Sequence, residues 1–177
     1  MDFQKQIATL FQPLVGQRAW GAKIGWGSFV TIEFGPKRLE HHHYHGDWHL
    51  WLYQCDWTLT SRTHEMAHSE SKRGVMRVAI GNLNGLELEA VAFEPEQMST
   101  EFIFQGNLRL KCQRYPDAQP DEECWMLFLP DKRVASLVTD GLRYEPSSLA
   151  GRKHVEDSET RDSKYSAERQ RQIRLED

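Results

Sequence analysis

The sequence predicts an α+β fold that is mainly β. It should consist of two related halves, each with a helix and antiparallel strands, that share one core. Most apolar segments are short, alternate between apolar and polar residues and end at glycine or other turn residues, which is typical of antiparallel strands. Only two segments carry apolar residues at helical spacing, and helix and strands follow in the same order in both halves.

The strongest single signal is the segment 48–59, WHLWLYQCDWTL, which is rich in tryptophan and leucine and contains neither glycine nor proline. Side chains alternate across a strand, so one face of this segment is apolar along its whole length and the other only in its first half. The pattern predicts one unbroken central strand, covered on both faces at its beginning. Its apolar face should hold His49, Trp51, Tyr53, Cys55, Trp57 and Leu59.

The first half begins with apolar residues at helical spacing over residues 3–14, which predict an amphipathic helix ended by Gly16. Two strands should follow at 17–24 and 28–34, joined by a tight turn at 25–27. The glycines near this turn do not have GxGxxG spacing, and a strand rather than a helix comes next. A hairpin therefore explains them better than a phosphate cradle.

The second half opens with an exposed connection and a helix, in which Met76, Ala79, Ile80 and Leu83 recur at helical spacing before Gly85. Strands follow, with one hairpin turn at Gly106 and Asn107 and another around Pro130 and Asp131. The elements are expected at residues 61–74 (connection), 70–84 (helix), 86–94, 99–105 and 107–115 (strands), and 124–130 and 133–139 (a final hairpin).

The repeated order of elements is interpreted as a possible internal duplication within one globular domain, residues 1–145, with halves at about 1–62 and 69–145. TIEFG (31–35) aligns with TEFIFQG (100–106), and WHLWL (48–52) with WMLFL (125–129). This alignment sets the histidine-rich segment opposite a strand, so that segment is itself a candidate strand or hairpin arm. Residues 146–177 have almost no large apolar groups and predict a polar, mobile tail.

Composition excludes several classes of function. A formal charge of −4 and a pI near 6.1 argue against a nucleic-acid surface, and no apolar run is long enough to cross a membrane. The N-terminus lacks the pattern of a signal peptide, which favours a cytoplasmic protein. The three cysteines, Cys55, Cys112 and Cys124, lie far apart in apolar context, and buried reduced thiols are expected. Because no Cys-x-x-Cys pair is present, a structural zinc site on sulfur is not expected.

Two resemblances concern larger parts of the chain. The strings GWGSFVTIEFG, WHLWLYQCDW and ECWMLFLPD resemble a set of uncharacterised bacterial proteins of unknown function, over most of residues 10–140. The later part, FIFQGNLRL with ECWMLFLPD, is also loosely similar to small β-rich domains of bacterial toxin-immunity proteins. Neither resemblance supplies a catalytic residue.

Two groups of histidines are candidate metal ligands. HHHYHGDWH places His41, His43 and His45 on one face if the segment is extended, where imidazoles can share a zinc ion, with Asp47 as a further ligand or an orienting group. The string HEMAH has the letters of an HExxH zinc motif, with His64 and His68 one turn apart on a helix. Its polar flanks instead favour an exposed connection. The composition of both groups favours solvated segments, and convergence of the two groups on one metal ion is a further alternative.

These observations predict a non-catalytic protein-binding module, with an immunity-like role as its sharpest version, and they assign no catalytic residue and no cofactor. Its binding surface would combine Gln54, Asp56 and Thr58 with the acidic loop 117–123 and would meet a basic partner. The alternative function is a zinc-binding protein or metal-dependent hydrolase that uses the histidine segments. Stoichiometric tightly bound metal separates the two hypotheses.

Overall fold

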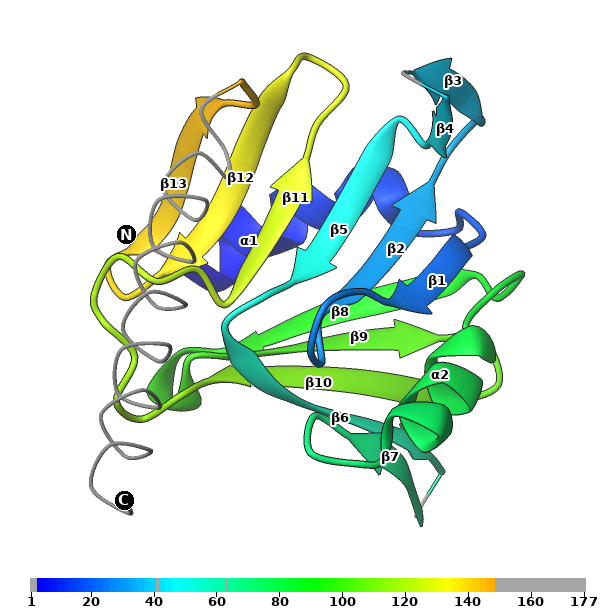
Figure 1. Cartoon of the computed structure of the whole chain (residues 1–177). Helices are drawn as coiled ribbons and strands as arrows, with labels where there is room; N and C mark the ends of the chain where they lie inside the picture. Colours follow the sequence, from blue (N-terminus) through cyan, green and yellow to red (C-terminus); the bar gives the residue numbers. More distant parts are fainter. Residues whose placement is uncertain (1–2, 41, 63, 149–177) are drawn as a thin grey trace, which may run out of the picture.

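The computed structural model describes residues 3–40, 42–62 and 64–148, which form two antiparallel sheets and two helices around one hydrophobic core (Figure 1). The predicted mainly β α+β fold is confirmed. In spatial order, the six-stranded sheet contains β1 (Trp20–Ile24), β2 (Val30–Phe34), β5 (Trp48–Leu52), β11 (Trp125–Phe128), β12 (Arg133–Val138) and β13 (Gly141–Pro146). The five-stranded sheet contains β7 (His64–His68), β6 (Cys55–Ser61), β10 (Leu108–Arg114), β9 (Ser99–Phe104) and β8 (Leu88–Glu94).

The remaining elements are short. β3 (Arg38–Glu40) and β4 (His43–His45) form a separate hairpin, so the prediction that the histidine segment is a hairpin arm is confirmed. The helices are α1 (Phe3–Phe11), continued by the 3-10 turn η1 (Gln12–Leu14), and α2 (Arg73–Gly81); a second turn, η2 (Pro95–Gln97), joins β8 to β9. Neither α-helix of the described chain is long and apolar enough to cross a membrane.

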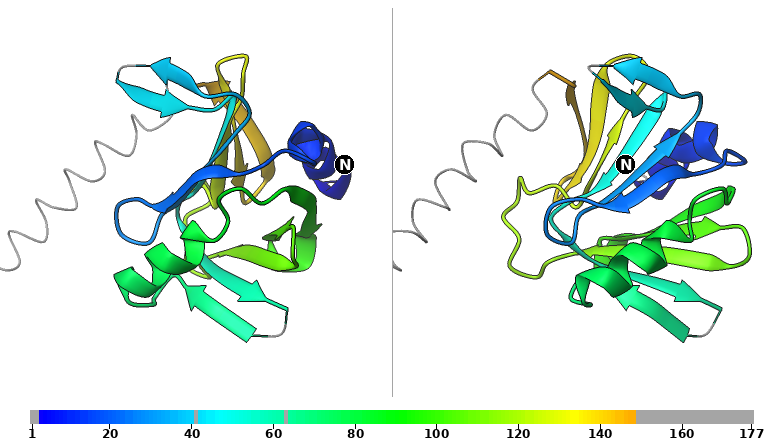
Figure 2. Two further views of the ribbon diagram at one scale, coloured as in Figure 1. Left: turned by 90° about the vertical axis from the view of Figure 1, so that its right-hand side faces the viewer. Right: turned by 45° about the vertical axis from the view of Figure 1, so that its right-hand side comes forward.

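Each helix covers one open end of the space between the sheets (Figures 1 and 2). α1 packs against β8 and β13, and α2 against β1 and β7, which are the four edge strands of the two sheets. The ring of Phe11 on α1 meets Phe102 and Trp125 edge-on, at centroid distances of 5.3 and 5.2 Å. Because exposed strand edges invite pairing with other chains, the two helices both complete the core and protect these edges.

The central segment differs from its prediction. It is not one strand but two, because the chain passes from the six-stranded to the five-stranded sheet at Tyr53 and Gln54. The backbone N–H groups of these two residues donate to the carbonyls of Cys124 and Glu123, at 3.1 and 3.2 Å. The change of sheet leaves two residues between β5 and β6 and reverses which alternate side chains face the core. The buried residues are Leu50 and Leu52 before it, and Cys55, Trp57 and Leu59 after it.

The two halves follow similar paths. After α1, strands β1, β2 and β5 lie side by side in the six-stranded sheet, and β6 and β7 then join the other sheet. After α2, strands β8, β9 and β10 lie side by side in the five-stranded sheet, and β11 to β13 then join the first. TIEFG and TEFIFQG thus occupy equivalent strands, but WHLWL and WMLFL are hydrogen-bonded neighbours rather than equivalents. The internal duplication stays a prediction.

Two other boundaries differ from expectation. β13 was not predicted, because Arg143 and Glu145 alternate with Leu142 and Tyr144 in a segment that reads as polar. Residues 61–74, expected as an exposed connection, contain the edge strand β7, whose Ala67 is buried. The predicted mobile tail lies almost wholly outside the described residues. Both hairpins of the second half lie where they were expected.

Replacing Leu50 by alanine tests the packing of the six-stranded sheet. Leu50 is fully buried and pairs with Ile32 on β2 and Leu127 on β11. The cavity left by the lost methyl groups should lower the free energy of unfolding by about 2–5 kcal/mol in urea denaturation. The matched control is Val78→Ala on α2, where the side chain is 73% exposed and a change below about 0.5 kcal/mol is expected. Equal effects in the two variants would contradict this packing.

Candidate metal centre on the outer face of the six-stranded sheet

Two polar side chains meet on the face of the six-stranded sheet that points away from the core. Glu33 on β2 and His49 on β5 are directly opposite each other in the strand register, next to the inward-facing pair Ile32 and Leu50. Nδ1 of His49 is hydrogen-bonded to Oε1 of Glu33. The carboxylate has no proton to give, so the imidazole N–H donates.

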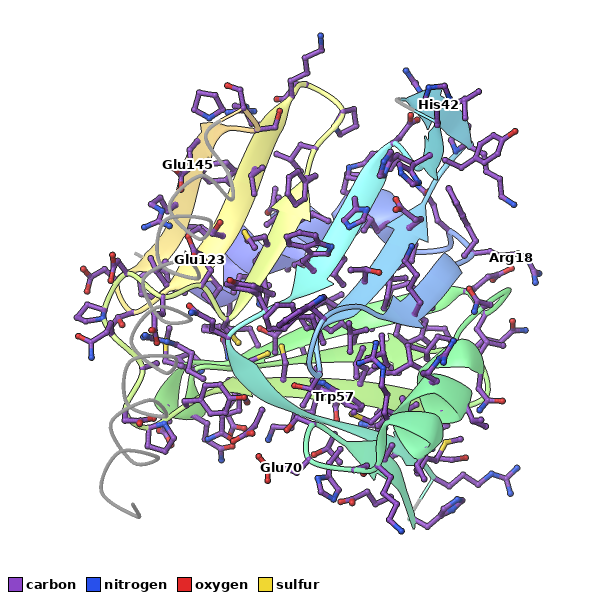
Figure 3. The ribbon with its side chains drawn as sticks, viewed as in Figure 1. Arg18, His42, Trp57, Glu70, Glu123 and Glu145 are labelled. Carbon is purple, nitrogen blue, oxygen red and sulfur yellow. The ribbon has the colours of Figure 1, made fainter. Side chains whose placement is uncertain are left out.

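The β3–β4 hairpin adds His45 to this pair. Nδ1 of His45 lies 3.5 Å from Oε1 of Glu33, and the two imidazole rings are 5.7 Å apart at an angle of 53°. Taking one ligand atom from each of the three side chains, all three atoms lie within 4.8 Å of one another. In Figure 3 the hairpin, marked by His42, stands above the ends of β2 and β5.

The turn from the hairpin into β5 is fixed by Gly46 and Asp47. The N–H of Gly46 donates to Oε2 of Glu33 at 2.9 Å, so both carboxylate oxygens have a partner. A Cβ at Gly46 would lie 2.2 Å from the carbonyl oxygen of Phe34, and only glycine allows this close approach. Asp47, which was expected to be a further ligand or an orienting group, instead pairs with Arg38 on β3 at 2.7 Å and ties the hairpin to its base.

Aromatic rings surround the other side of His49. Its ring meets Trp51 and Phe128 nearly edge to face, at 5.7 and 5.6 Å. Glu33 is 6% exposed, although it lies on the outer face. Burial by itself would raise the pKa of Glu33, but the hydrogen bond and charge of His49, the N–H of Gly46 and the charge of His45 outweigh it and hold this pKa below its usual value. Glu33 is therefore a preformed carboxylate at neutral pH.

This donor set has the chemistry of a transition-metal site. One carboxylate and two imidazoles are common ligands of zinc, and bond lengths of about 2.0–2.2 Å hold ligand atoms about 3–3.5 Å apart. The three side chains are already near this arrangement. A metal ion would take the place of the proton between His49 and Glu33, because an imidazole binds a metal through a nitrogen that carries no proton, and a protonated imidazole gives up one proton on binding.

Only part of the predicted ligand set belongs to this centre. His45 does; His43 lies exposed on the same strand, and His41 lies outside the described residues. His64 and His68 are on β7, in the other sheet, so the two histidine groups do not converge.

The HEMAH string is neither a helix nor a zinc motif. Its residues form β7, with an irregularity in pairing that leaves Met66 without a partner on β6. His64 is opposite Ser61 and His68 is opposite Thr58, whose side chains point to opposite faces of β6. The two imidazoles are also separated by four residues of strand, about 13 Å. They cannot share a metal ion.

The sequence analysis placed His49 on the apolar face of the central segment and did not identify Glu33 as an acidic partner. The register between the segments 31–35 and 48–52 is the signal that could have identified Glu33. Once TIEFG and WHLWL are paired as antiparallel neighbours with their apolar residues aligned, Glu33 falls opposite His49.

Neither a protein-family model, nor a curated protein, nor a solved structure matches the chain. The resemblances to uncharacterised bacterial proteins and to toxin-immunity domains therefore stay predictions. Function has to be inferred from the geometry of the side chains.

Replacing Glu33 by glutamine should make stability less dependent on pH. The folded-state pKa of Glu33 is lowered, so its ionised form stabilises the fold above the ordinary value near 4.5, and this stabilisation is lost as the pH falls through the lowered value. At pH 7 the variant should be less stable by about 1.5–3 kcal/mol, the range for a hydrogen bond to a charged group. Below pH 4.5 the difference from the wild type should shrink.

Urea denaturation across this pH range measures the effect. The matched control is Glu89→Gln on the exposed face of β8, which should leave the pH profile unchanged. A difference between wild type and Glu33→Gln that stays constant from pH 7 to pH 3 would contradict the assignment of an ionised, hydrogen-bonded Glu33.

Proposed function

We propose that this protein binds a divalent transition-metal ion through Glu33, His45 and His49. The observation that carries the proposal is the convergence of one carboxylate and two imidazoles, whose ligand atoms lie within 4.8 Å of one another. Nitrogen ligands favour zinc, copper, nickel or iron over magnesium and calcium, which prefer oxygen alone. Zinc is the ion that the sequence analysis named, and it is the first probe.

The ion would be bound at the surface rather than enclosed. The side chain of His45 is 43% exposed, whereas those of His49 and Glu33 are 16% and 8% exposed. Three protein ligands leave at least one position of a tetrahedral ion for water, as in catalytic rather than structural zinc sites. Metal-dependent hydrolysis is the finer form of this proposal, and binding is its first requirement.

Isothermal titration calorimetry of untagged protein with zinc tests the centre. The wild type should bind one zinc ion per chain with release of protons, so affinity should fall as the pH is lowered. His45→Ala, His49→Ala and Glu33→Gln should each weaken binding by more than the ~10–100-fold that follows loss of a residue that only orients a ligand.

His64→Ala and His68→Ala are the controls, because both histidines lie on β7, away from the centre. Binding that is lost in these controls, or retained at full affinity without His45 and His49, would contradict the proposed ligand set.

We propose, as a second function, the binding of a basic protein partner on an acidic surface around Tyr115, which shares Asp56 and the loop 117–123 with the surface predicted from the sequence. The pKa of Tyr115 supports it: burial, followed by the negative charges of Asp56, Glu70 and Asp117, raises this pKa to about 12. Three acidic groups from β6, the β7–α2 turn and the loop after β10 thus act on one point of the surface. A patch of one sign favours a partner of the opposite sign.

Paired charge-neutralising variants test this surface. Immobilised wild-type protein should retain a basic protein from a bacterial lysate and release it as salt rises, because exposed charges are screened. The double variant Glu70→Gln with Asp117→Asn should abolish retention. The control double variant, Glu89→Gln with Glu96→Gln, changes residues on the far edge of the five-stranded sheet and in the turn beside it, and should still retain the partner. If both double variants retained the same proteins, the acidic binding surface would be contradicted.

A further inference from the structure

The three cysteines, which are far apart in the sequence, meet in the core. Cys55 begins β6, Cys112 lies on β10 and Cys124 immediately precedes β11. Their sulfur atoms lie within 4.8 Å of one another, and none of the residues is more than 1% exposed. The expectation of buried thiols is confirmed, but the cysteines are clustered rather than scattered. In Figure 3, sulfur atoms gather between the two sheets near the passage from β5 to β6.

The change of sheet in the central segment brings the cluster together. Tyr53 N–H holds the carbonyl of Cys124, and Cys55 follows two residues later, so sulfurs from both sheets reach one place. Cys112 is supplied by the neighbouring strand of the five-stranded sheet, where it pairs with Trp57. Cys124 N–H donates to the carbonyl of Leu137 on β12, which fixes the third sulfur. The three thiols are therefore held by three different segments of backbone.

The geometry favours a shared ion over a disulfide for the pair on the five-stranded sheet. Cys55 is opposite Arg114 and Cys112 is opposite Trp57, so the two cysteines are diagonal neighbours. Diagonal neighbours have Cα atoms about 7–8 Å apart, beyond the ~4.4–6.8 Å that a disulfide spans. Three thiolates around one metal ion, with bonds of about 2.3 Å, hold their sulfurs about 4 Å apart, close to the arrangement in the core.

Hydrogen bonds among the three sulfurs shift their pKa values in different directions. Burial would raise the pKa of Cys112, but hydrogen bonds from Cys124, Cys55 and both the backbone and side chain of Thr100 lower it to about 5. The hydroxyl oxygen of Thr100 accepts the indole N–H of Trp125 at 2.9 Å. Its hydroxyl proton therefore remains available for the hydrogen bond to Cys112. The hydrogen bonds that Cys55 and Cys124 make to Cys112 raise the pKa of each of these two thiols, so an ion that binds all three sulfurs would displace their protons.

We propose that Cys55, Cys112 and Cys124 bind one copper(I) ion in the core of the protein. Soft thiolate ligands select copper(I), zinc or iron–sulfur clusters, and zinc in a closed site requires four ligands. Among the described residues, the metal-ligating group at this place consists of the three cysteines alone, without a histidine or carboxylate. Three sulfur ligands without a fourth suit copper(I). Copper–sulfur bonds replace sulfur–hydrogen bonds, the thiol protons pass to solvent, and no oxidation state changes.

This site is independent of the proposed centre at Glu33, His45 and His49. The two use different donor atoms, and one lies on the outer face of a sheet while the other lies between the sheets. Because the cysteines are buried, the ion would enter during folding or through local opening. The experiment therefore supplies it while the chain folds.

Refolding in the presence of copper tests the proposal. The full chain, unfolded in urea with a reductant, is refolded without oxygen in the presence of a weak copper(I) complex and then passed through a desalting column. One copper per chain should remain, x-ray absorption should show sulfur ligands only, and the midpoint of thermal unfolding should rise, because an ion that binds only the folded state stabilises it. A zinc salt is supplied in a parallel refolding.

Variants locate the ion. Cys55→Ala, Cys112→Ala and Cys124→Ala should each lose the retained copper, whereas His45→Ala with His49→Ala should keep it. Val30→Ala, another fully buried core position, is the control for loss of packing and should also keep the copper. If a cysteine variant fails to fold, the ligand atoms seen by x-ray absorption of the wild type decide the question. Absence of retained copper, nitrogen ligands, or retention of zinc in its place would each overturn the proposal.

Discussion

The fold depends on one constraint, the passage of the central segment from one sheet to the other at Tyr53 and Gln54. The passage is held by two backbone hydrogen bonds to the chain just before β11, so it joins both halves of the molecule at the same point. It also reverses the inward-facing side chains, so that the apolar residues of β5 and of β6 reach one shared core. An unbroken strand would direct one of these sets to solvent.

The same reversal separates the two candidate metal sites. His49, on the outer face of β5, lies beside a carboxylate and a second imidazole. Cys55, six residues later, faces the core and meets two other sulfurs. One short stretch of chain thus contributes a nitrogen ligand to an exposed site and a sulfur ligand to a buried one, and the difference in softness and in access to water would let the two sites hold different ions.

Helices and hairpin complete this arrangement in different ways. The two α-helices cover the four sheet edges and bury apolar surface, so they contribute stability rather than ligands. The β3–β4 hairpin packs outside both sheets, and its position depends on the close approach of Gly46 to β2. Only His45 of the candidate site lies on this hairpin, whereas Glu33 and His49 lie on strands of the six-stranded sheet.

The sequence by itself determined the fold class, both helices and most strands, because hydrophobic periodicity and turn residues are local signals. It also marked the histidine segment as unusual. Only the tertiary structure decided that the central segment is two strands, that HEMAH is an edge strand, and that Glu33 meets His45 and His49. It alone brought three scattered cysteines together. These features depend on strand register and on which sheet a strand joins, and both are set by contacts between residues distant along the chain.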